Sequence, residues 1–308
     1  MTLNEPYIMK IFLNEAAPVI RKAVFPIAGL GSRFLPVTKA TPKEMLPVVD
    51  KPLIQYAVEE AYASGIRQMI FVTGRTKRAV EDHFDTAYEL ETELERAGKH
   101  ELLALARSIA PSDMTCIYIR QHRALGLGHA VLCARPLIGQ EPFAVILADD
   151  FMVSQRPVMA QMVAHFEQFR CSVVAVAQVP PTEVNKYGIV EGRQHSSGAL
   201  QLTHVVEKPA LGQTASTTAI VGRYVLMPTI FDRLAVIAST HTVGEIQLTD
   251  AILQALKTEA VHALAFEGKR YDCGSKLGML QATVDIGAQH PDVGQQFALW
   301  LSERQNQI

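Results

Sequence analysis

The apolar residues of this chain occur in short continuous runs that alternate with longer, mostly polar segments. The runs cover residues 22–28, 67–74, 114–121, 142–150 and 171–179. The intervening segments 52–65, 76–107, 128–137 and 157–170 carry apolar residues at helical spacing. Continuously apolar strands are typical of a parallel sheet that is covered on both faces. The pattern therefore predicts an α/β fold with a mixed, mostly parallel central sheet and helices on both faces.

Two prolines and a glycine mark boundaries in this pattern. Pro52 suits the first turn of the helix that is predicted to follow it, and Gly65 suits the end of that helix. Pro26 falls inside the first apolar run, where it cannot donate a hydrogen bond to a neighbouring strand. We therefore expect Pro26 at a bulge or at the end of its strand.

The pattern changes after about residue 180. Short, partly alternating runs at 187–192, 199–209 and 218–228 are interrupted by helical segments at 229–238 and 245–257. These runs predict a smaller β region, and the chain from residue 276 to 304 is predicted to be helical. No linker-like composition separates these parts, so a single α/β domain is the simplest organisation.

Domain boundaries follow from these changes in pattern. We expect one domain over residues 22–290, with one half at about 22–150 and the other at about 151–270. Residues 1–21 are predicted to form an N-terminal extension, and residues 291–308 a helical tail.

Composition narrows the class of protein. The chain has 308 residues, 48% hydrophobic and 19% charged, with a formal net charge of −2. This balance lacks the basic excess of a nucleic-acid-binding surface. The sequence shows neither a membrane-spanning apolar stretch nor a secretory signal, so we expect a cytoplasmic protein. The four cysteines form no C-x-x-C pair, and they are predicted to be small buried thiols: Cys116, Cys133, Cys171 and Cys273.

The stretch AGLGSRFLPVTKATPKEMLP, residues 28–47, directly follows the first predicted strand. It fails the dinucleotide fingerprint because Phe34 stands at the third glycine position, and it also lacks the Walker A spacing. Gly29 and Gly31 let backbone N–H groups approach phosphate oxygens, while Arg33 and Lys43 add positive charge. The other interpretation is a glycine turn with exposed basic residues. The combination in one connection favours a phosphate-binding loop.

A carboxylate pair, Asp149 and Asp150, ends the strand predicted at 142–150. The carboxyl ends of strands in open α/β sheets line the ligand crevice. A carboxylate at this position suits Mg²⁺, which prefers oxygen ligands and shares them with phosphates. On the residues alone, a helix cap or a turn is an equally good interpretation.

The segment GLGSRFLPVTKATPKEMLPVVDKPLIQYAVEE resembles the N-terminal signature of bacterial UTP–glucose-1-phosphate uridylyltransferases, which belong to the sugar-phosphate nucleotidyltransferases. The resemblance continues through VEDHFDTAYELE, RQHRALGLGHAVLCARP, VILADD, YGIVEG, VVEKP, AIVGRYVL, GEIQLTDAI and YDCGSKLGMLQA. These motifs span roughly residues 22–300. They imply a Rossmann-like nucleotidyltransferase fold, with the nucleotide on the 22–150 side and the sugar on the 151–270 side.

The resemblance implies a Mg²⁺-dependent reaction of UTP with glucose 1-phosphate that yields UDP-glucose and pyrophosphate. The sugar phosphate attacks the α-phosphorus of UTP in line, and two polyanions must be brought together. Arg33 and Lys43 are then expected to hold the triphosphate and the departing pyrophosphate. The resemblance assigns Asp149 to the metal, with Asp272 as a second candidate ligand. Asp150 is expected either to support the metal ligand from behind or to be exposed.

Recognition of the base and ribose is implied for the first half of the chain. Gln121 can pair with a pyrimidine edge, and Gly126 lets the backbone approach the ring. Ala28 and Gly29 are expected to contact the nucleotide through backbone groups. Glu44 is expected to accept from a ribose hydroxyl, the alternative being an ordinary solvated glutamate. His129 is expected to be a structural hydrogen-bonding residue.

Recognition of the sugar is implied for the second half. Glu207 is expected to accept from glucose hydroxyls, Lys208 to bind the sugar phosphate, and Gly188 to contact the glucose through its backbone. Successive residues on a strand point to opposite faces, so Glu207 and Lys208 share a side only if the strand ends or bulges there. Pro209 makes such an end plausible.

Three matters stay open in the sequence. One alternative is the same chemistry with another nucleotide or sugar, for example with dTTP in place of UTP. Another alternative is a non-catalytic regulator of this fold. A nicotinamide-dependent oxidoreductase is disfavoured by Phe34. The family suggests a homodimer or homotetramer. A helical face in the segment 245–257 is predicted to pack in the core or to contact another subunit: Ile246, Thr249, Ile252 and Leu253.

Overall fold

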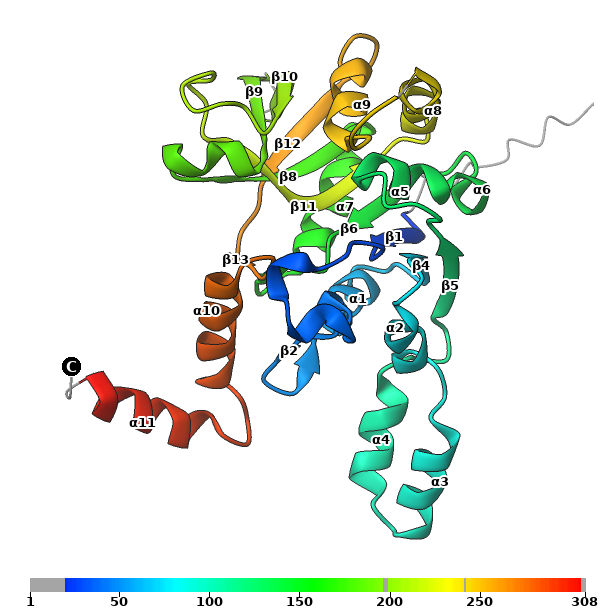
Figure 1. Cartoon of the computed structure of the whole chain (residues 1–308), viewed down its shortest axis with the longest axis vertical. Helices are drawn as coiled ribbons and strands as arrows, with labels where there is room; N and C mark the ends of the chain where they lie inside the picture. Colours follow the sequence, from blue (N-terminus) through cyan, green and yellow to red (C-terminus); the bar gives the residue numbers. More distant parts are fainter. Residues whose placement is uncertain (1–19, 196–198, 241, 306–308) are drawn as a thin grey trace, which may run out of the picture.

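The computed structural model describes residues 20–305, apart from 196–198 and 241, so the predicted extension lies outside the described residues except for its last two. In this part of the chain, nine strands form one sheet in the order β5-β4-β1-β6-β11-β8-β12-β10-β9 (Figure 1). The strands are β1 (Lys22–Pro26), β4 (Gln68–Thr73), β5 (Thr115–Arg120), β6 (Phe143–Ile146), β8 (Ser172–Gln178), β9 (Gly188–Gln194), β10 (Leu200–Glu207), β11 (Thr218–Leu226) and β12 (Val261–Ala265).

The direction of the strands differs between the two ends of this sheet. β5, β4, β1 and β6 are parallel, but β11 runs antiparallel to both β6 and β8. β12 is parallel to β8, and β10 is antiparallel to β12 and β9. The prediction of a mixed sheet is confirmed, but "mostly parallel" does not describe the sheet as a whole, because parallel pairing is confined to the first four strands and to the β8–β12 pair. Nearly all of β11 is buried, and such a run carries no signal of strand direction.

Helices cover both faces of the sheet, as predicted. One face carries α1 (Leu53–Ala63), α2 (Arg78–His83) and α7 (Val158–Phe169). The other carries α5 (Leu127–Cys133), α6 (Arg135–Ile138), α8 (Ile230–Thr240) and α9 (Leu248–Ala255). Alternate residues of β1 enter the two cores: Val24 packs with α5, whereas Ala23 and Phe25 pack with α1 and α7.

The predicted boundaries at Pro26, Pro52 and Gly65 are confirmed. Pro26 is the last residue of β1, and the next N–H group, that of Ile27, bonds to the Val72 carbonyl. Pro52 caps α1, and Gly65 follows its end with a φ of +88°. The proline therefore removes no hydrogen bond from the interior of the strand.

The helical region predicted at 76–107 is three helices: α2, α3 (Tyr88–Arg96) and α4 (His100–Ser108). Gly98, with a φ of +66°, turns the chain between α3 and α4. These two pack against each other as a hairpin that projects from the body of the molecule (Figure 1).

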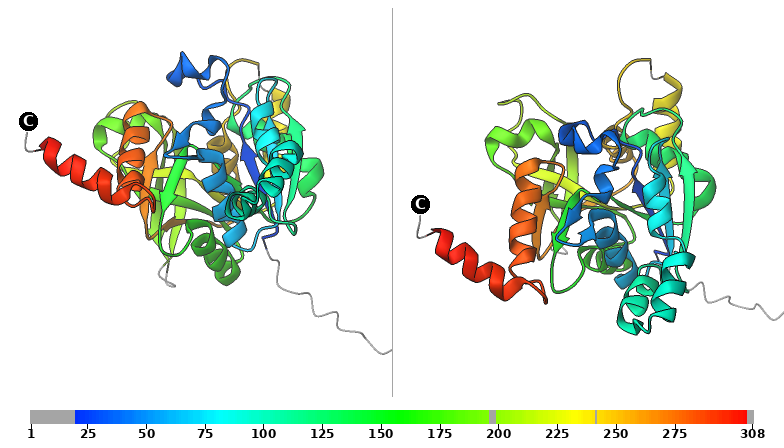
Figure 2. Two further views of the ribbon diagram at one scale, coloured as in Figure 1. Left: turned by 90° about the horizontal axis from the view of Figure 1, so that it is seen from below. Right: turned by 60° about the horizontal axis from the view of Figure 1, so that its bottom comes forward.

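A smaller layer joins the C-terminal part to the sheet. β7 (Asp150–Val153) pairs with β13 (Lys269–Asp272), and β2 (Pro47–Val48) pairs with β3 (Lys51–Pro52). Together with α10 (Lys276–Gly287) these strands enclose a third apolar cluster that includes Leu53, Phe151 and Tyr271. The predicted helical tail is present as α11 (Gly294–Gln305). Figure 2 shows α10 and α11 on the side of the molecule away from β5.

The sequence also gave expectations about the cysteines and about membrane-spanning segments. All four cysteines, which lie within the described ranges, are free thiols, one buried and three partly buried. Among the helices of residues 20–305, none has the length and apolar character that a bilayer crossing requires.

Candidate active site

The loop that follows β1 is folded tightly against itself. It forms three short 3₁₀ turns: η1 (Ser32–Phe34), η2 (Val37–Lys39) and η3 (Lys43–Met45). Gly31 adopts a left-handed conformation (φ 67°, ψ 24°), and its carbonyl accepts a 2.7 Å hydrogen bond from Thr38 Oγ1. The last turn brings Lys43 back over the glycines, so that a Cβ at Gly29 would lie 3.8 Å from Lys43 Cε. Contacts within the loop therefore hold its glycines and Lys43 next to one another.

Lys43 forms an ion pair with Asp149, with 2.5 Å between Nζ and Oδ2. Asp149 lies beyond the end of β6, in the connection to β7. Burial by itself raises the pKa of Asp149, but Lys43 outweighs that effect and holds the pKa below its usual value. Burial opposes the charge on Lys43 as well, and Asp149 raises the Lys43 pKa above its usual value. Both groups are therefore ionised at neutral pH.

Asp272 and Arg33 approach the same carboxylate. A Cβ placed on Gly274 would lie 3.0 Å from Asp272 Oδ1, 3.2 Å from Asp149 Oδ2 and 3.5 Å from Arg33 Nη1. Two carboxylate oxygens and a guanidinium nitrogen therefore lie close together beside Gly274, where any side chain would crowd them. In the described ranges, no cluster of three or more His, Cys, Asp or Glu side chains is suited to hold a metal ion. A cation at this point would need further oxygen ligands from substrate or water.

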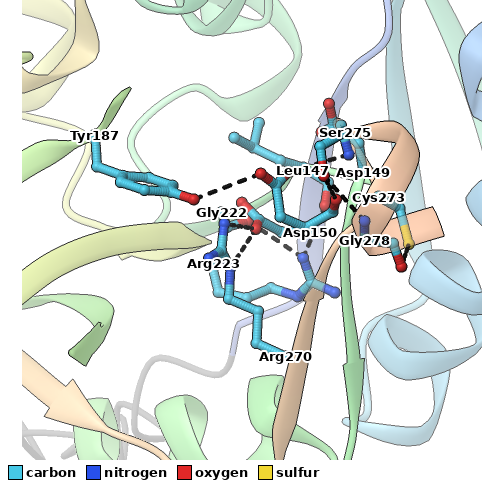
Figure 3. A network of polar contacts seen from close by, with 12 residues as sticks. Leu147, Asp149, Asp150, Tyr187, Gly222, Arg223, Arg270, Cys273, Ser275 and Gly278 are labelled. Carbon is cyan, nitrogen blue, oxygen red and sulfur yellow. Dashed lines mark hydrogen bonds and ion pairs between the residues drawn. The ribbon is translucent and has the colours of Figure 1, made fainter. Parts of the chain in front are cut away.

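Asp150 belongs to a polar network beside this point (Figure 3). Its carboxylate pairs with Arg270, with 2.5 Å from Arg270 Nε to Asp150 Oδ1, and its side chain is 13% exposed. The expectation that Asp150 is exposed is therefore wrong. The other expectation, that Asp150 supports the metal ligand from behind, stays a prediction. Burial raises the pKa of Asp150, the neighbouring carboxylates of Asp149 and Asp272 raise it further, and Arg270 opposes them.

A buried ion pair supports the strand end that carries these carboxylates. Arg223 on β11 pairs with Glu60 on α1 at 2.7 Å, and its Nη1 donates 2.8 Å to the Leu147 carbonyl. Arg223 is 1% exposed. The buried Arg223 guanidinium therefore fixes the position of residues 147–150. Arg223 does not line either of the two cavities described next.

Two adjoining cavities lie along the carboxyl ends of β1 and β6, and Lys43 and Asp149 line both. The larger cavity, about 720 Å³, is also lined by predicted site residues Arg33, Gly188, Glu207, Lys208 and Asp272. The smaller cavity, about 440 Å³, is also lined by predicted site residues Ala28, Gly29, Gly31, Gln121 and Gly126. The predicted site residues thus line two separate cavities, which adjoin at the Lys43–Asp149 ion pair.

Gln121 is buried in the wall of the smaller cavity. Its Nε2 donates 2.9 Å to His129 Nδ1 and 3.2 Å to the Gly126 carbonyl. Both amide hydrogens are thereby engaged, and Oε1 is the atom that can still accept from a ligand. The structural role predicted for His129 is confirmed. Gly126 (φ +93°) allows close backbone packing, because a Cβ there would lie 2.8 Å from the Ile246 carbonyl oxygen.

Glu207 and Lys208 lie together at the end of β10. Lys208 has a φ of +44°, and its Nζ is 3.3 Å from Glu207 Oε1. The change of backbone direction after the last strand residue confirms the condition under which the two side chains could share a side. Thr249 on α9 donates 3.0 Å to Glu207 Oε2. A subunit contact is the wrong interpretation for Thr249, since it is buried inside the chain and lines the larger cavity.

The side chain of Glu44, a residue of the loop itself, is buried and lines neither cavity. It is 2% exposed and pairs with Lys77 at 2.8 Å, while its Oε1 has no hydrogen-bond partner. Burial raises the pKa of Glu44, and Lys43 and Lys77 oppose that effect. A solvated glutamate is therefore the wrong interpretation, and neither cavity has Glu44 on its wall.

Sequence reasoning missed four residues of this site: Lys77, Tyr187, Thr249 and Arg270. Lys77, Tyr187 and Thr249 contact partners far away in the sequence, which no local pattern reveals. Arg270 had a usable signal, because the period of two in the strand KRYD puts Arg270 and Asp272 on the same face.

Comparisons with known proteins match nearly the whole chain. The nucleotidyl transferase family matches residues 22–302. A UTP–glucose-1-phosphate uridylyltransferase of Bacillus subtilis (strain 168) is 48% identical over 92% of this chain and 95% of its own.

Two solved structures are similar over most of their length. A UTP-bound UGPase from Acinetobacter baumannii is 41% identical, with a TM-score of 0.84 over 92% of this chain and 99% of that one. A UDP-glucose pyrophosphorylase complexed with UDP-glucose is 45% identical, with a TM-score of 0.78 over 87% of this chain and 98% of that one. The chain therefore belongs to the nucleotidyl transferase family and, within it, to the bacterial UTP–glucose-1-phosphate uridylyltransferases.

Proposed function

We propose that this chain is a UTP–glucose-1-phosphate uridylyltransferase, which converts UTP and glucose 1-phosphate into UDP-glucose and pyrophosphate. The observation that carries the proposal is the pair of cavities that meet at Lys43 and Asp149. A reaction between two phosphorylated substrates needs two adjoining sites with fixed positive charge at their junction. The relatives named above carry this activity in their names.

We assign the smaller cavity to UTP. The glycines of the loop, Gly29 and Gly31, let backbone N–H groups approach the phosphates, as does the backbone at Ala28. Uracil presents an N3–H donor between two carbonyl acceptors. The free acceptor of Gln121, its Oε1, matches that donor, whereas cytosine presents an acceptor at N3. This pairing favours UTP over CTP.

We assign the larger cavity to glucose 1-phosphate. The Glu207 carboxylate can accept from two sugar hydroxyls, and the Thr249 hydroxyl holds it in place. Lys208, half exposed at the cavity rim, is available to the sugar phosphate. A side chain at Gly188 would displace Thr249 and Glu207, because a Cβ there would lie 2.7 Å from Thr249 Cγ2 and 3.2 Å from Glu207 Oε2.

Charge neutralisation at the junction is the main catalytic task of the protein. The sugar phosphate oxygen attacks the α-phosphorus, and the bond to pyrophosphate breaks. Arg33 and Lys43 place two cations where negative charge is brought together. Since both lie on a folded loop and Lys43 is also held by Asp149, little reorganisation is required when the substrates bind.

The residues at the junction fit a divalent cation of the Mg²⁺ type. Asp149 Oδ2 and Asp272 Oδ1 lie close together beside Gly274, and the Lys43 pair keeps Asp149 ionised. Mg²⁺ bound there would neutralise charge on the phosphates and orient the α-phosphate. The domain boundaries, the cytoplasmic location, the homodimer or homotetramer and a Glu44–ribose contact stay predictions.

The test is a pyrophosphate-release assay of the purified chain across UTP, dTTP, CTP and ATP, each with glucose 1-phosphate and other sugar 1-phosphates. We expect the highest kcat/KM for UTP with glucose 1-phosphate, dependent on Mg²⁺. A preference for dTTP would reassign the chain to thymidylyl transfer. Binding of both substrates with no release of pyrophosphate would make it a non-catalytic relative.

A further inference from the structure

Three carboxylates, not two, lie at the junction of the cavities. Asp149 and Asp150 follow β6, and Asp272 stands opposite Asp150 in the β7–β13 pair. All three line the larger cavity. Three carboxylates that converge bind a divalent cation more strongly than two do. Among the described residues no three such side chains are arranged to hold a metal ion together, so some contact keeps the third away.

The third carboxylate is withheld by contacts on two sides. Nε and Nη2 of Arg270 on β13 both contact one oxygen of the Asp150 carboxylate, Oδ1, with 2.5 Å from Nε to Oδ1 (Figure 3). On the opposite side Asp150 lies against the backbone of Gly222, where a Cβ would lie 2.6 Å from Asp150 Cβ. Asp150 is thus clamped between β13 and β11.

The same arginine also reaches the sugar side of the site. Its guanidinium lies 5.1 Å from the centroid of the Tyr187 ring, and the Tyr187 hydroxyl donates 3.4 Å to Asp272 Oδ2. The Tyr187 carbonyl in turn accepts from the backbone N–H of Lys208. A single cation therefore contacts both the withheld carboxylate and the tyrosine that bonds to the second metal candidate.

We propose that Arg270 is a positioning residue that withholds Asp150 from the divalent cation, so that the cation site consists of Asp149 and Asp272. This inference rests on the proposed function. A two-carboxylate site binds the cation weakly until phosphate oxygens complete it, which ties cation binding to UTP binding. A free third carboxylate would capture the cation without substrate and place an anion beside the sugar phosphate.

The test measures Mn²⁺ binding to the nucleotide-free protein by electron paramagnetic resonance, beside the KM values of both substrates. Arg270→Gln frees Asp150, and we expect Mn²⁺ to bind on the order of tenfold more tightly, because ligand charge sets the affinity of such sites. The KM for glucose 1-phosphate should rise more than the KM for UTP. The double variant Asp150→Asn/Arg270→Gln removes the freed carboxylate and should return both quantities toward the wild-type values.

Two results would overturn the proposal. The first is Mn²⁺ affinity in Arg270→Gln equal to that of the wild type. The second is a double variant whose KM for glucose 1-phosphate is still raised about tenfold, since Arg270 would then bind substrate directly. The double variant removes both charges of the Arg270–Asp150 pair, so neither partner is left buried and unpaired. The KM values of the double variant can therefore be compared with those of the wild type even if Arg270→Gln does not fold. The Mn²⁺ measurement requires no turnover, and it therefore decides this proposal even if the proposed function fails.

Discussion

The two cavities of the site are walled in different ways. One wall of the smaller cavity, the backbone wall, consists of residues with a methyl group or no side chain: Ala28, Gly29, Gly31 and Gly126, on a loop and a turn that follow parallel strands. The larger cavity is bounded by charged side chains, with Glu207, Lys208, Arg270 and Asp272 at the ends of antiparallel strands.

This difference predicts two modes of selectivity. A backbone wall selects by shape and by hydrogen-bond direction, so added atoms should damage it. A wall of side chains selects by paired charge, so removed charges should damage it. Lys43 and Asp149 belong to both walls, and changes there should affect both substrates.

The largest effect is expected at the shared ion pair. Asp149→Asn keeps the shape of the side chain but removes the charge that pairs with Lys43 and, as proposed, with the metal. We expect kcat to fall on the order of 10²–10³-fold, comparable to the loss of one transition-state donor. Steady-state pyrophosphate release measures the loss.

Asp50→Asn is the matched control, since Asp50 is exposed and pairs with His290 away from both cavities. Wild-type turnover is expected for this control. An Asp149→Asn enzyme with wild-type turnover in Mg²⁺ would remove Asp149 from the mechanism.

The next effect tests the backbone wall. Gly126→Ala would put a Cβ 2.7 Å from Glu245 Cβ and 2.8 Å from the Ile246 carbonyl oxygen, in a conformation (φ +93°) that disfavours side chains. Overpacking of this kind costs about 1–3 kcal/mol, which corresponds to roughly 5–150-fold. We expect the KM for UTP to rise and the KM for glucose 1-phosphate to change little.

Gly139→Ala serves as the control for a glycine with positive φ, because no atom lies within 4 Å of a Cβ there. It should lose some stability but keep the wild-type KM for UTP. If Gly126→Ala raised the KM for glucose 1-phosphate instead, the assignment of the smaller cavity to UTP would be wrong.

A smaller effect is expected at the side-chain wall. Thr249→Val removes the hydroxyl that orients Glu207 while keeping the volume of the side chain. A hydrogen bond to a charged group contributes about 1.5–3 kcal/mol, and Glu207 keeps its own contacts to the sugar. We expect a KM for glucose 1-phosphate raised up to about tenfold, with the KM for UTP unchanged. Equal changes in both KM values would contradict the separation of the walls.

The smallest effect concerns pH and lies away from both walls. His165 Nε2 lies 3.1 Å from His262 Nδ1, and burial, together with the charge of a neighbouring histidine, lowers the pKa of each. A lowered folded pKa means that the folded state prefers the neutral form. The resulting stability is present above the unfolded pKa of about 6.5 and is lost as the pH falls below it.

The free energy of unfolding should therefore decrease from pH 7.5 to pH 5.5 and decrease less in His165→Gln. Urea unfolding at the two pH values measures this difference. Identical pH dependence in wild type and variant would exclude the pair as the cause. The Lys43–Asp149 pair does not change its charge in this range, because both pKa values are displaced away from it.

Some parts of the molecule could be predicted from local pattern and others could not. Pro26 gave a correct strand end, and the strand end at Lys208 was tied correctly to a shared side with Glu207. The antiparallel direction of β11 was missed, because a run buried on both faces reads the same in either direction. Arg270 and Thr249 were missed for a related reason: each partner lies more than 40 residues away, at a distance set by the fold.

The central claim is that one nucleotide and one divalent cation occupy the smaller cavity and the carboxylate pair beside it. A crystal structure with UTP and Mn²⁺, with the metal located by its anomalous signal, tests this most directly. We predict Mn²⁺ between Asp149 and Asp272 and the uracil against Gln121 and Gly126. Ordered UTP bound elsewhere, with neither carboxylate in contact with the metal, would contradict the account.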